Sequence, residues 1–154
     1  MSNDVKTFDL DLHAAEFSQT IINNVLENKE KLKPGDTENL ITKALGVLQE
    51  NGAYACALFL YARTSSDNKI AAHVRNGLLQ MTSQLGLAPP QNAAWQDGLK
   101  FVSGTICDDL DRLLLVRQLW EQTLIYARYG AKAWGEKEKE EKREKEKQSR
   151  SDNQ

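Results

Sequence analysis

Apolar residues recur at helical spacing along almost the whole chain. In the first such stretch they fall every four residues, at Phe17, Ile21 and Val25. Residues four apart lie on one face of an α-helix, so the pattern predicts an amphipathic helix over Leu12 to Leu32. Asp9 or Asp11 is the expected N-cap, and Pro34-Gly35 is the expected stop.

A second amphipathic helix is predicted around Leu40 to Leu48, with Asp36 as its N-cap. Gly46 lies inside it and costs about 1 kcal/mol relative to alanine, so we expect another backbone to pack closely there. Asn51-Gly52 then stops this helix. The same dipeptide forms hairpin turns, but its flanks do not alternate as strands do, so two consecutive helices are favoured.

The next two segments are also predicted to be helices. Ala53 to Arg63 is apolar nearly all round, which indicates a helix buried on most sides, with a short buried strand as the alternative. The following helix has its apolar stripe at Ile70, Val74, Leu78, Met81 and Leu85. Gly86 ends it, and the prolines within residues Leu87 to Asn92 make that segment a hinge.

Two further helices complete the predicted fold. Ala93 to Thr105 is a weaker candidate, with Trp95, Leu99 and Val102 on one face. Asp108 or Asp109 caps a long last helix that runs to about Trp134. Its expected stripe is Leu110, Leu113, Leu114, Leu119 or Trp120, Leu124, Ala127 and Ala131. No segment shows convincing strand alternation, so the fold class is all-α, a compact bundle of five or six helices.

Length and charge divide the chain into one helical domain and a tail. The 154 residues are enough for one domain, assigned to residues 1–135. Residues 136–154 hold seven basic and seven acidic residues and no apolar one. Such a segment cannot join a core, so we expect a frayed helix or disorder.

Composition excludes several classes of protein. The net charge of −2 is unlike that of an autonomous nucleic-acid-binding domain. No apolar run is long enough to span a membrane, and the first residues do not resemble a signal peptide, so a cytoplasmic location is expected. Cys56 and Cys107 provide neither a disulfide framework nor a metal finger.

Few residues suggest catalysis. The chain has no phosphate-cradling glycine motif and no zinc-peptidase motif. Asp108, Asp109 and Asp111 are either a divalent-cation site or, as we favour, acidic residues at a helix N-terminus. Neither cysteine has a histidine nearby in sequence to activate it, and His13 and His73 are the only histidines. We therefore expect no enzyme, no cofactor and no metal.

The last helix has a more informative pattern, because basic residues alternate with aromatic ones along it. Arginine with aromatic side chains on one helix is typical of surfaces that contact phosphates and stack on bases, although buried aromatics and solvated arginines give the same spacing. Basic residues of other helices extend the pattern. The predicted RNA-contacting residues are Lys43, Arg63, Arg75, Arg112, Arg117, Arg128 and Lys132.

The stretch ENLITKALGVLQENGAYACALFLYARTS, Glu38 to Ser65, resembles the small subunit of the Cmr-type (type III-B) CRISPR effector complex. That family has an apolar helix, an Asn-Gly stop and a second apolar helix ending in a basic residue. Leu113 to Glu140 is similar to its long aliphatic, aromatic and basic last helix. The small subunit of the related Csm complex is also all-α and is a close competitor.

The resemblance implies a non-catalytic subunit of an RNA-guided complex for antiviral defence. Such subunits stack in several copies and contact the backbone subunits, the large subunit, and the guide and target RNA. The family supplies no active-site motif to transfer, so the basic residues named above remain inferences from charge. A helical protein–protein adaptor is the alternative, with an apolar groove lined by Tyr54, Phe59 and Trp120. A small enzyme would need His73 to meet Asp108 and Asp109 in a cleft.

Overall fold

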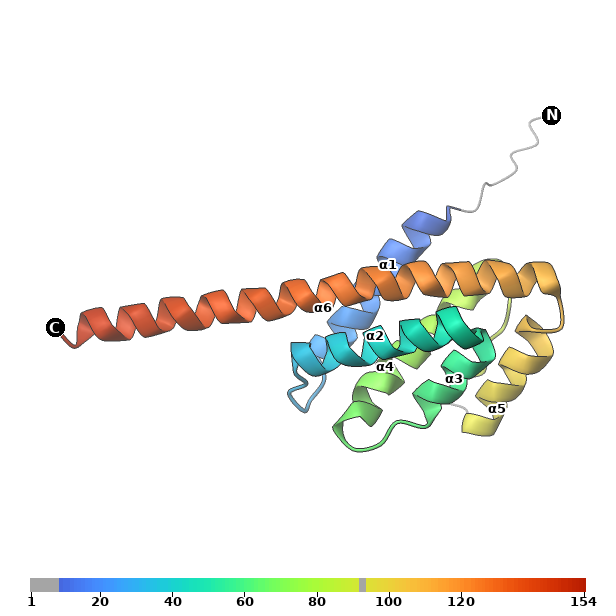
Figure 1. Cartoon of the computed structure of the whole chain (residues 1–154), viewed down its shortest axis with the longest axis horizontal. Coiled ribbons are helices and arrows are strands. Elements are labelled where there is room, and N and C mark those ends of the chain that lie inside the picture. Colours follow the sequence, from blue (N-terminus) through green and yellow to red (C-terminus); the bar gives the residue numbers. More distant parts are fainter. Residues whose placement is uncertain (1–8, 92–93) are drawn as a thin grey trace, which may run out of the picture.

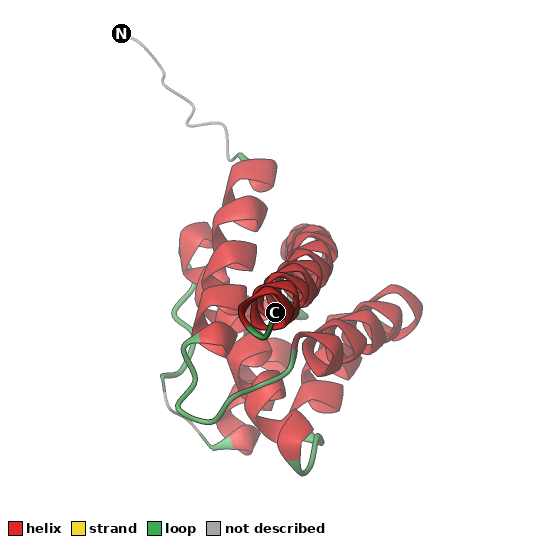
Figure 2. Cartoon of the chain, turned by 90° about the vertical axis from the view of Figure 1, so that its left-hand side faces the viewer, coloured by secondary structure: helices red, strands yellow, loops and turns green. Residues whose placement is uncertain are grey.

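The computed structural model describes residues 9–91 and 94–154, and every regular element in these two ranges is helical (Figure 2). The predicted all-α bundle is therefore confirmed. A 3₁₀ turn at Thr82–Leu85 follows the fourth helix, and a π-helical turn at Val102–Ile106 follows the fifth. The α-helices are α1 (Leu10–Leu26), α2 (Pro34–Asn51), α3 (Ala53–Tyr61), α4 (Ser66–Met81), α5 (Trp95–Phe101) and α6 (Leu110–Asp152).

The long helix α6 is the axis of the fold (Figure 1). Helix α2 runs antiparallel to it, because Gln49 at the end of α2 contacts Arg117 and Glu121, whereas Pro34 at its start lies against Gly135. Helix α1 also packs on α6, with Ile22 beside Gly130. Helices α3 and α4 lie beneath α2, and α5 packs beside α3.

One face of α6 is buried from Val116 to Ala131. Its members are Val116, Leu119, Trp120, Thr123, Leu124, Ala127 and Ala131. The predicted stripe was right from Leu119 onward and wrong at its start, since Leu110 and Leu114 are 68% and 53% exposed. At 100° per residue Leu114 lies about 200° from Val116, so the two cannot share the buried face.

Trp120 joins α6 to the end of α4. Its side chain is 1% exposed, and its indole N–H donates a hydrogen bond to the Leu78 carbonyl at 2.9 Å. That carbonyl is free because α4 tightens at its end, where the Thr82 N–H turns to Leu79 instead. A side chain this deeply buried cannot line an exposed groove, so the expected groove of Tyr54, Phe59 and Trp120 is wrong in its third member.

Helix α1 is shorter than predicted, and the reason is the role of Pro34. The helix ends at Leu26, and Pro34 begins α2 with Lys33 as N-cap, so Pro34-Gly35 starts a helix instead of stopping one. Proline suits the first position of a helix because the N–H it lacks would have no intrahelical partner there. Asp36 consequently lies in the first turn of α2 and is not the cap.

Two of the expected caps are confirmed. The Asp9 carboxylate accepts a hydrogen bond from the Leu12 N–H at 3.0 Å, and the Asp109 carboxylate accepts one from the Arg112 N–H at 2.8 Å. Gly52 separates α2 from α3 with a positive φ of 94°, which a residue with a side chain rarely adopts. The choice of two helices at Asn51-Gly52 over a hairpin is thus confirmed.

Helices α3 and α5 depart from the sequence patterns. On α3, Tyr54 and Leu58 are 42% and 44% exposed, so one side of this apolar helix faces solvent. Helix α5 covers only Trp95–Phe101 before the π-helical turn, and Trp95 is 55% exposed instead of sharing a buried face with Leu99. The predicted start of this helix and the end of the hinge, at 92–93, lie outside the described residues.

Close helix contacts occur at glycines other than the one expected. A β-carbon on Gly46 would meet nothing within 4 Å, so the prediction of close packing there was wrong. Gly77 of α4 instead lies directly against the buried side chain of Ile21 on α1, and Gly98 of α5 lies against the Tyr61 hydroxyl of α3. A β-carbon at either position would overlap these side chains, and the close approach of α1 to α4 depends on Gly77.

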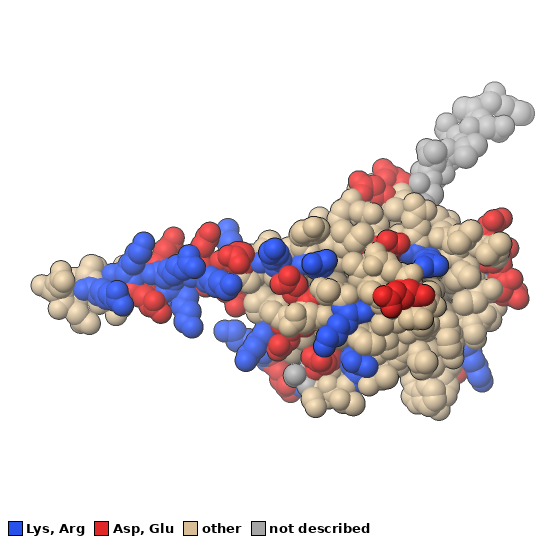
Figure 3. All heavy atoms as spheres, in the orientation of Figure 1, with Lys and Arg blue, Asp and Glu red and all other residues tan. Residues whose placement is uncertain are grey.

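Helix α6 does not end near Trp134 but continues to Asp152. We call residues 136–152 the extension; it projects from the body over about 25 Å at 1.5 Å per residue (Figures 1 and 3). Of its side chains, only Glu138 is partly buried; it accepts a hydrogen bond from the Trp134 indole at 3.0 Å.

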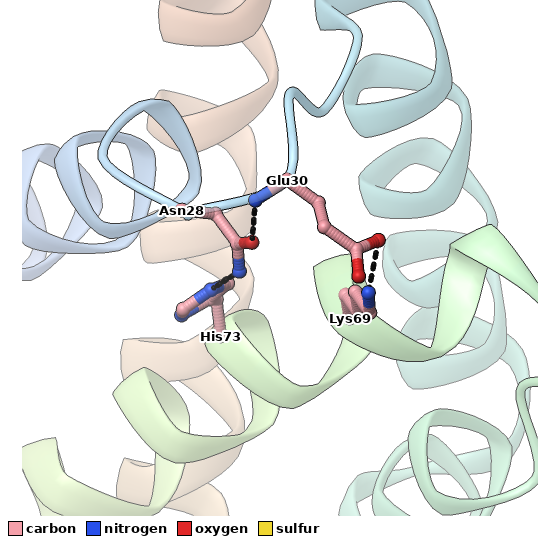
Figure 4. A network of polar contacts seen from close by, with 4 residues as sticks. All are labelled: Asn28, Glu30, Lys69 and His73. Carbon is pink, nitrogen blue, oxygen red and sulfur yellow. Dashed lines mark hydrogen bonds and ion pairs between the residues drawn. The ribbon is translucent and has the colours of Figure 1, made fainter.

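The connection between α1 and α2 is fastened to α4 by polar contacts (Figure 4). The Asn28 side-chain carbonyl accepts a hydrogen bond from the Glu30 N–H at 3.0 Å, which leaves its amide group facing His73 Nε2 at 2.8 Å. The amide can only donate, so Nε2 must accept and the His73 ring must be neutral. Lys69 of α4 forms an ion pair with Glu30 beside it.

The two helix-interior glycines should respond oppositely to alanine. Gly77→Ala forces Ile21 to move within a packed core, which costs roughly 1–3 kcal/mol and exceeds the gain in helix propensity. Gly46→Ala has open space and should stabilise the protein by about 1 kcal/mol. Urea unfolding of both variants measures the two free energies; equal changes would contradict the close α1–α4 approach.

Removing residues 136–154 should hardly change thermal stability. The extension buries almost nothing, and exposed groups contribute little, so we expect the melting temperature to shift by less than about 2 °C. Thermal unfolding followed by circular dichroism at 222 nm checks this. A fall several times larger would mean that the extension packs on the body.

Stability should fall in mild acid because of His73. Burial lowers the pKa of His73 below its ordinary 6.5, so the unfolded chain binds the proton more readily than the folded one. The stabilisation is complete above pH 6.5 and is lost as pH falls toward the folded pKa, with a slope of at most about 1.4 kcal/mol per pH unit. Urea unfolding between pH 8 and pH 5 should show a shallower loss for His73→Gln than for the wild type; parallel curves would contradict the assignment.

Candidate nucleic-acid interface

Four of the seven predicted RNA-contacting residues are arginines that contact the protein itself. Two of them stack on aromatic rings of α3. The Arg63 guanidinium lies 3.9 Å from the centre of the Phe59 ring, and its Nε donates to the Phe59 carbonyl at 3.1 Å. The Arg75 guanidinium lies 4.2 Å from the centre of the Tyr61 ring, and burial lowers its pKa from the ordinary value. Both are half-buried and hold α3 in place.

The other two arginines lie on α6 and bond to the ends of neighbouring helical segments. Arg112 donates to the Thr105 carbonyl at 2.8 Å, in the π-helical turn. Arg117 donates to the Gln49 carbonyl at 2.6 Å, in the last turn of α2, where carbonyls have no partner within the helix. A positive charge also interacts favourably with a helix C-terminus. Both side chains therefore fix the start of α6 against the body.

The remaining three residues are exposed. Lys43 lies on α2, and Arg128 and Lys132 lie on α6, so two helices that pack antiparallel carry all three. None of the three has an ion pair or hydrogen bond among the described residues. Their ammonium and guanidinium groups are thus available to an anionic partner.

The aromatic residues of α6 are mostly engaged inside the protein. Trp120 is in the core, the Tyr126 hydroxyl donates to the Asp11 carboxylate, and the Trp134 indole bonds to Glu138. The Asp11 hydrogen bond raises the pKa of Tyr126. Tyr129, the fourth aromatic residue of α6, is well exposed, at 63%, and it adjoins Arg128 in sequence. Base stacking from this helix is thus limited to Tyr129.

A groove of about 570 Å³ lies where the start of α2 meets α6 and its extension. Five lysines line it, together with Glu38 of α2 and acidic residues of the extension; the lysines are Lys31, Lys132, Lys139, Lys142 and Lys145. The groove was not predicted from the sequence, because the charged tail was expected to lie apart from the body. Only the antiparallel packing of α2 on α6 brings Lys31 near residues that lie a hundred positions later in the chain.

The residues considered for catalysis have other roles in the structure. Asp109 is an N-cap, and His73 accepts a hydrogen bond from Asn28. Burial raises the pKa of the Cys56 thiol to about 12 and also raises that of Cys107, so both favour the thiol over the nucleophilic thiolate. Across residues 9–91 and 94–154, no three His, Cys, Asp or Glu side chains gather as a metal site requires.

Within the same described ranges, no helix is both long enough and apolar enough to cross a membrane. Comparison with protein-family models, curated proteins and solved structures finds no match to this chain. The candidate interface is therefore defined by its own residues, and its main feature is the exposure of Lys43, Arg128 and Lys132.

Proposed function

We propose that this chain is the non-catalytic small subunit of a type III CRISPR RNA-guided complex of Cmr type, with the Csm type as the alternative. The observation that carries the proposal is that Arg128 and Lys132 of α6 and Lys43 of α2 are exposed. Within the described part of the chain these side chains have no ion pair or hydrogen bond, and a phosphate backbone is the partner that their charge fits.

The helices around this surface support the same proposal. The segment with the family resemblance, Glu38 to Ser65, covers most of α2, the Gly52 turn and all of α3. Glu38 lies in the second turn of α2, so the resembling segment follows nearly the whole helix pair. The second resembling segment, Leu113 to Glu140, lies entirely within α6.

The low net charge fits a subunit that shares its RNA with others. Each phosphate contact adds a modest, salt-dependent amount of binding energy. A chain with a net charge of −2, in which the protein itself engages four of the seven predicted contact residues, would hold RNA weakly alone. Further copies of the chain, together with the backbone and large subunits, would supply the remaining contacts to the guide and target RNA.

The helical adaptor remains the second candidate, because two pairs of apolar side chains are exposed. Tyr54 and Leu58 are neighbours on α3, and Leu110 and Leu114 are neighbours on α6, each pair four residues apart. Single exposed apolar residues are ordinary, but pairs on one helix face suit a protein partner. An adaptor would use these pairs without RNA, whereas a CRISPR subunit would use them against neighbouring subunits.

A native pull-down from the host separates the two candidates. The tagged full chain should recover larger CRISPR subunits together with short RNAs that share a repeat-derived end, because guide RNAs are processed from repeats. Mass spectrometry identifies the proteins, and sequencing identifies the RNA. An untagged strain is the control for background.

Recovery of protein partners with no enriched RNA would reject the CRISPR proposal and favour the adaptor. A Leu110→Ser, Leu114→Ser variant provides a matched test of the protein contacts, because both side chains are exposed and their loss should not unfold the chain. It should lose protein partners if α6 begins at a subunit interface.

A further inference from the structure

Basic residues recur every 11 positions along α6, at Arg117, Arg128, Lys139 and Arg150. Eleven residues make about 3.06 helical turns, so each of these residues lies within about 20° of the next around the helix. Lys132 and Arg143 are also 11 apart, each four residues after a member of the first set. Arg117 is bonded to α2, and we call the others the basic stripe: Arg128, Lys132, Lys139, Arg143 and Arg150.

The spacing gives the extension two different sides although its composition is neutral. Glu140, Glu141 and Glu144 lie away from the stripe, at 60° to 160° from Arg143 at 100° per residue. Figure 3 shows lysine and arginine side chains gathered along the viewed face of the extension, with acidic side chains mostly at its margins. A segment with seven basic and seven acidic residues thus presents a mainly basic surface on one side.

Two acidic residues lie on or beside the stripe and do not cancel it. Glu136 at its edge pairs with Lys139 at 3.5 Å, and both side chains are more than 60% exposed. An exposed pair of this kind is worth about 0–1 kcal/mol, so a phosphate can displace it. Glu146 lies within the stripe. The stripe therefore contains five basic side chains, against two acidic ones when Glu136 at its edge is included.

The stripe is accessible and continuous with the interface on the body. All five side chains are exposed, and Arg128 and Lys132 belong both to the stripe and to the exposed surface of α2 and α6. From Arg128 to Arg150 the stripe extends about 33 Å along a single helix. The extension contains no apolar or aromatic residue, so it suits neither a dry protein interface nor base stacking.

We propose that the basic stripe binds the sugar–phosphate backbone of an RNA duplex, and that the extension supplies more of the phosphate contacts than the body does. This inference rests on the proposed function, since it names the surface through which the subunit contacts RNA. Contacts of this kind position the duplex without selecting its sequence.

The test compares two variants of the full chain that lose the same charge from the same extension. Lys139→Gln with Arg143→Gln removes two members of the stripe. Lys137→Gln with Lys145→Gln is the matched control, because these two lysines lie about 120° or more from both stripe positions. Circular dichroism should show equal helix content in both variants.

The readout is fluorescence anisotropy of a labelled RNA duplex of about 20 base pairs, titrated with protein at several salt concentrations. The stripe variant should bind several-fold more weakly at low salt. The slope of log affinity against log salt should shrink by about 1–2, as expected for the loss of two phosphate contacts. The control variant should keep the wild-type slope, and a duplex of unrelated sequence should bind equally well.

Three results would overturn the inference: no duplex binding by the wild type, equal losses in both variants, or full competition by poly-glutamate at equal charge. The last would point to an acidic protein as partner. If the pull-down recovers CRISPR subunits and RNA while the two variants behave alike, the stripe fails and the proposed function stands. If the pull-down recovers no RNA while the stripe variant alone loses binding, the CRISPR assignment fails and the stripe stands.

Discussion

The structure depends on the burial of one face of α6. Helices α1 and α2 pack on this face directly, and Trp120 reaches across it to the Leu78 carbonyl at the end of α4. Small residues at Ala127, Gly130, Ala131 and Gly135 let helices α1 and α2 come close to α6. Ile22 of α1 lies against Gly130, and Pro34 of α2 lies against Gly135. Because one straight helix carries these contacts, its remaining length projects as a rigid continuation of the core.

The arginines of the body illustrate why charge on a helix is an ambiguous sign of function. Arg112 and Arg117 bond to backbone carbonyls, and Arg63 and Arg75 stack on rings of α3. A guanidinium has five donors and a flat apolar face, so it can join helices as readily as it binds phosphate. Lysine has a compact, strongly hydrated charge, and Lys43 and Lys132 stay in solvent. The basic residues left to a ligand are consequently those without an aromatic ring or a helix end nearby.

Helix content and several boundaries could be predicted because their causes are local. The caps at Asp9 and Asp109, the stop at Gly52 and the buried stripe from Leu119 to Ala131 follow from spacing and from the nature of single residues. The errors arose where one residue type is compatible with two local structures. A proline such as Pro34 can begin a helix or end one, and a glycine inside a helix, such as Gly46, can lie at a close helix contact or in open space. For the candidate site, Lys43, Arg128 and Lys132 were placed correctly on the surface. The sequence did not show that backbone carbonyls and aromatic rings of the protein would engage the four arginines.

The sequence by itself determined that the chain is helical, where several helices begin or end, and that basic residues repeat along the last of them. These properties depend on interactions between residues a few positions apart. Only the tertiary structure decided which basic side chains stay in solvent, that Lys31 shares a groove with the extension, and that Trp120 is buried in the core. Those outcomes depend on contacts between residues far apart in the chain, such as Arg117 with Gln49 and Gly77 with Ile21, and no local pattern encodes which distant partner a side chain will meet.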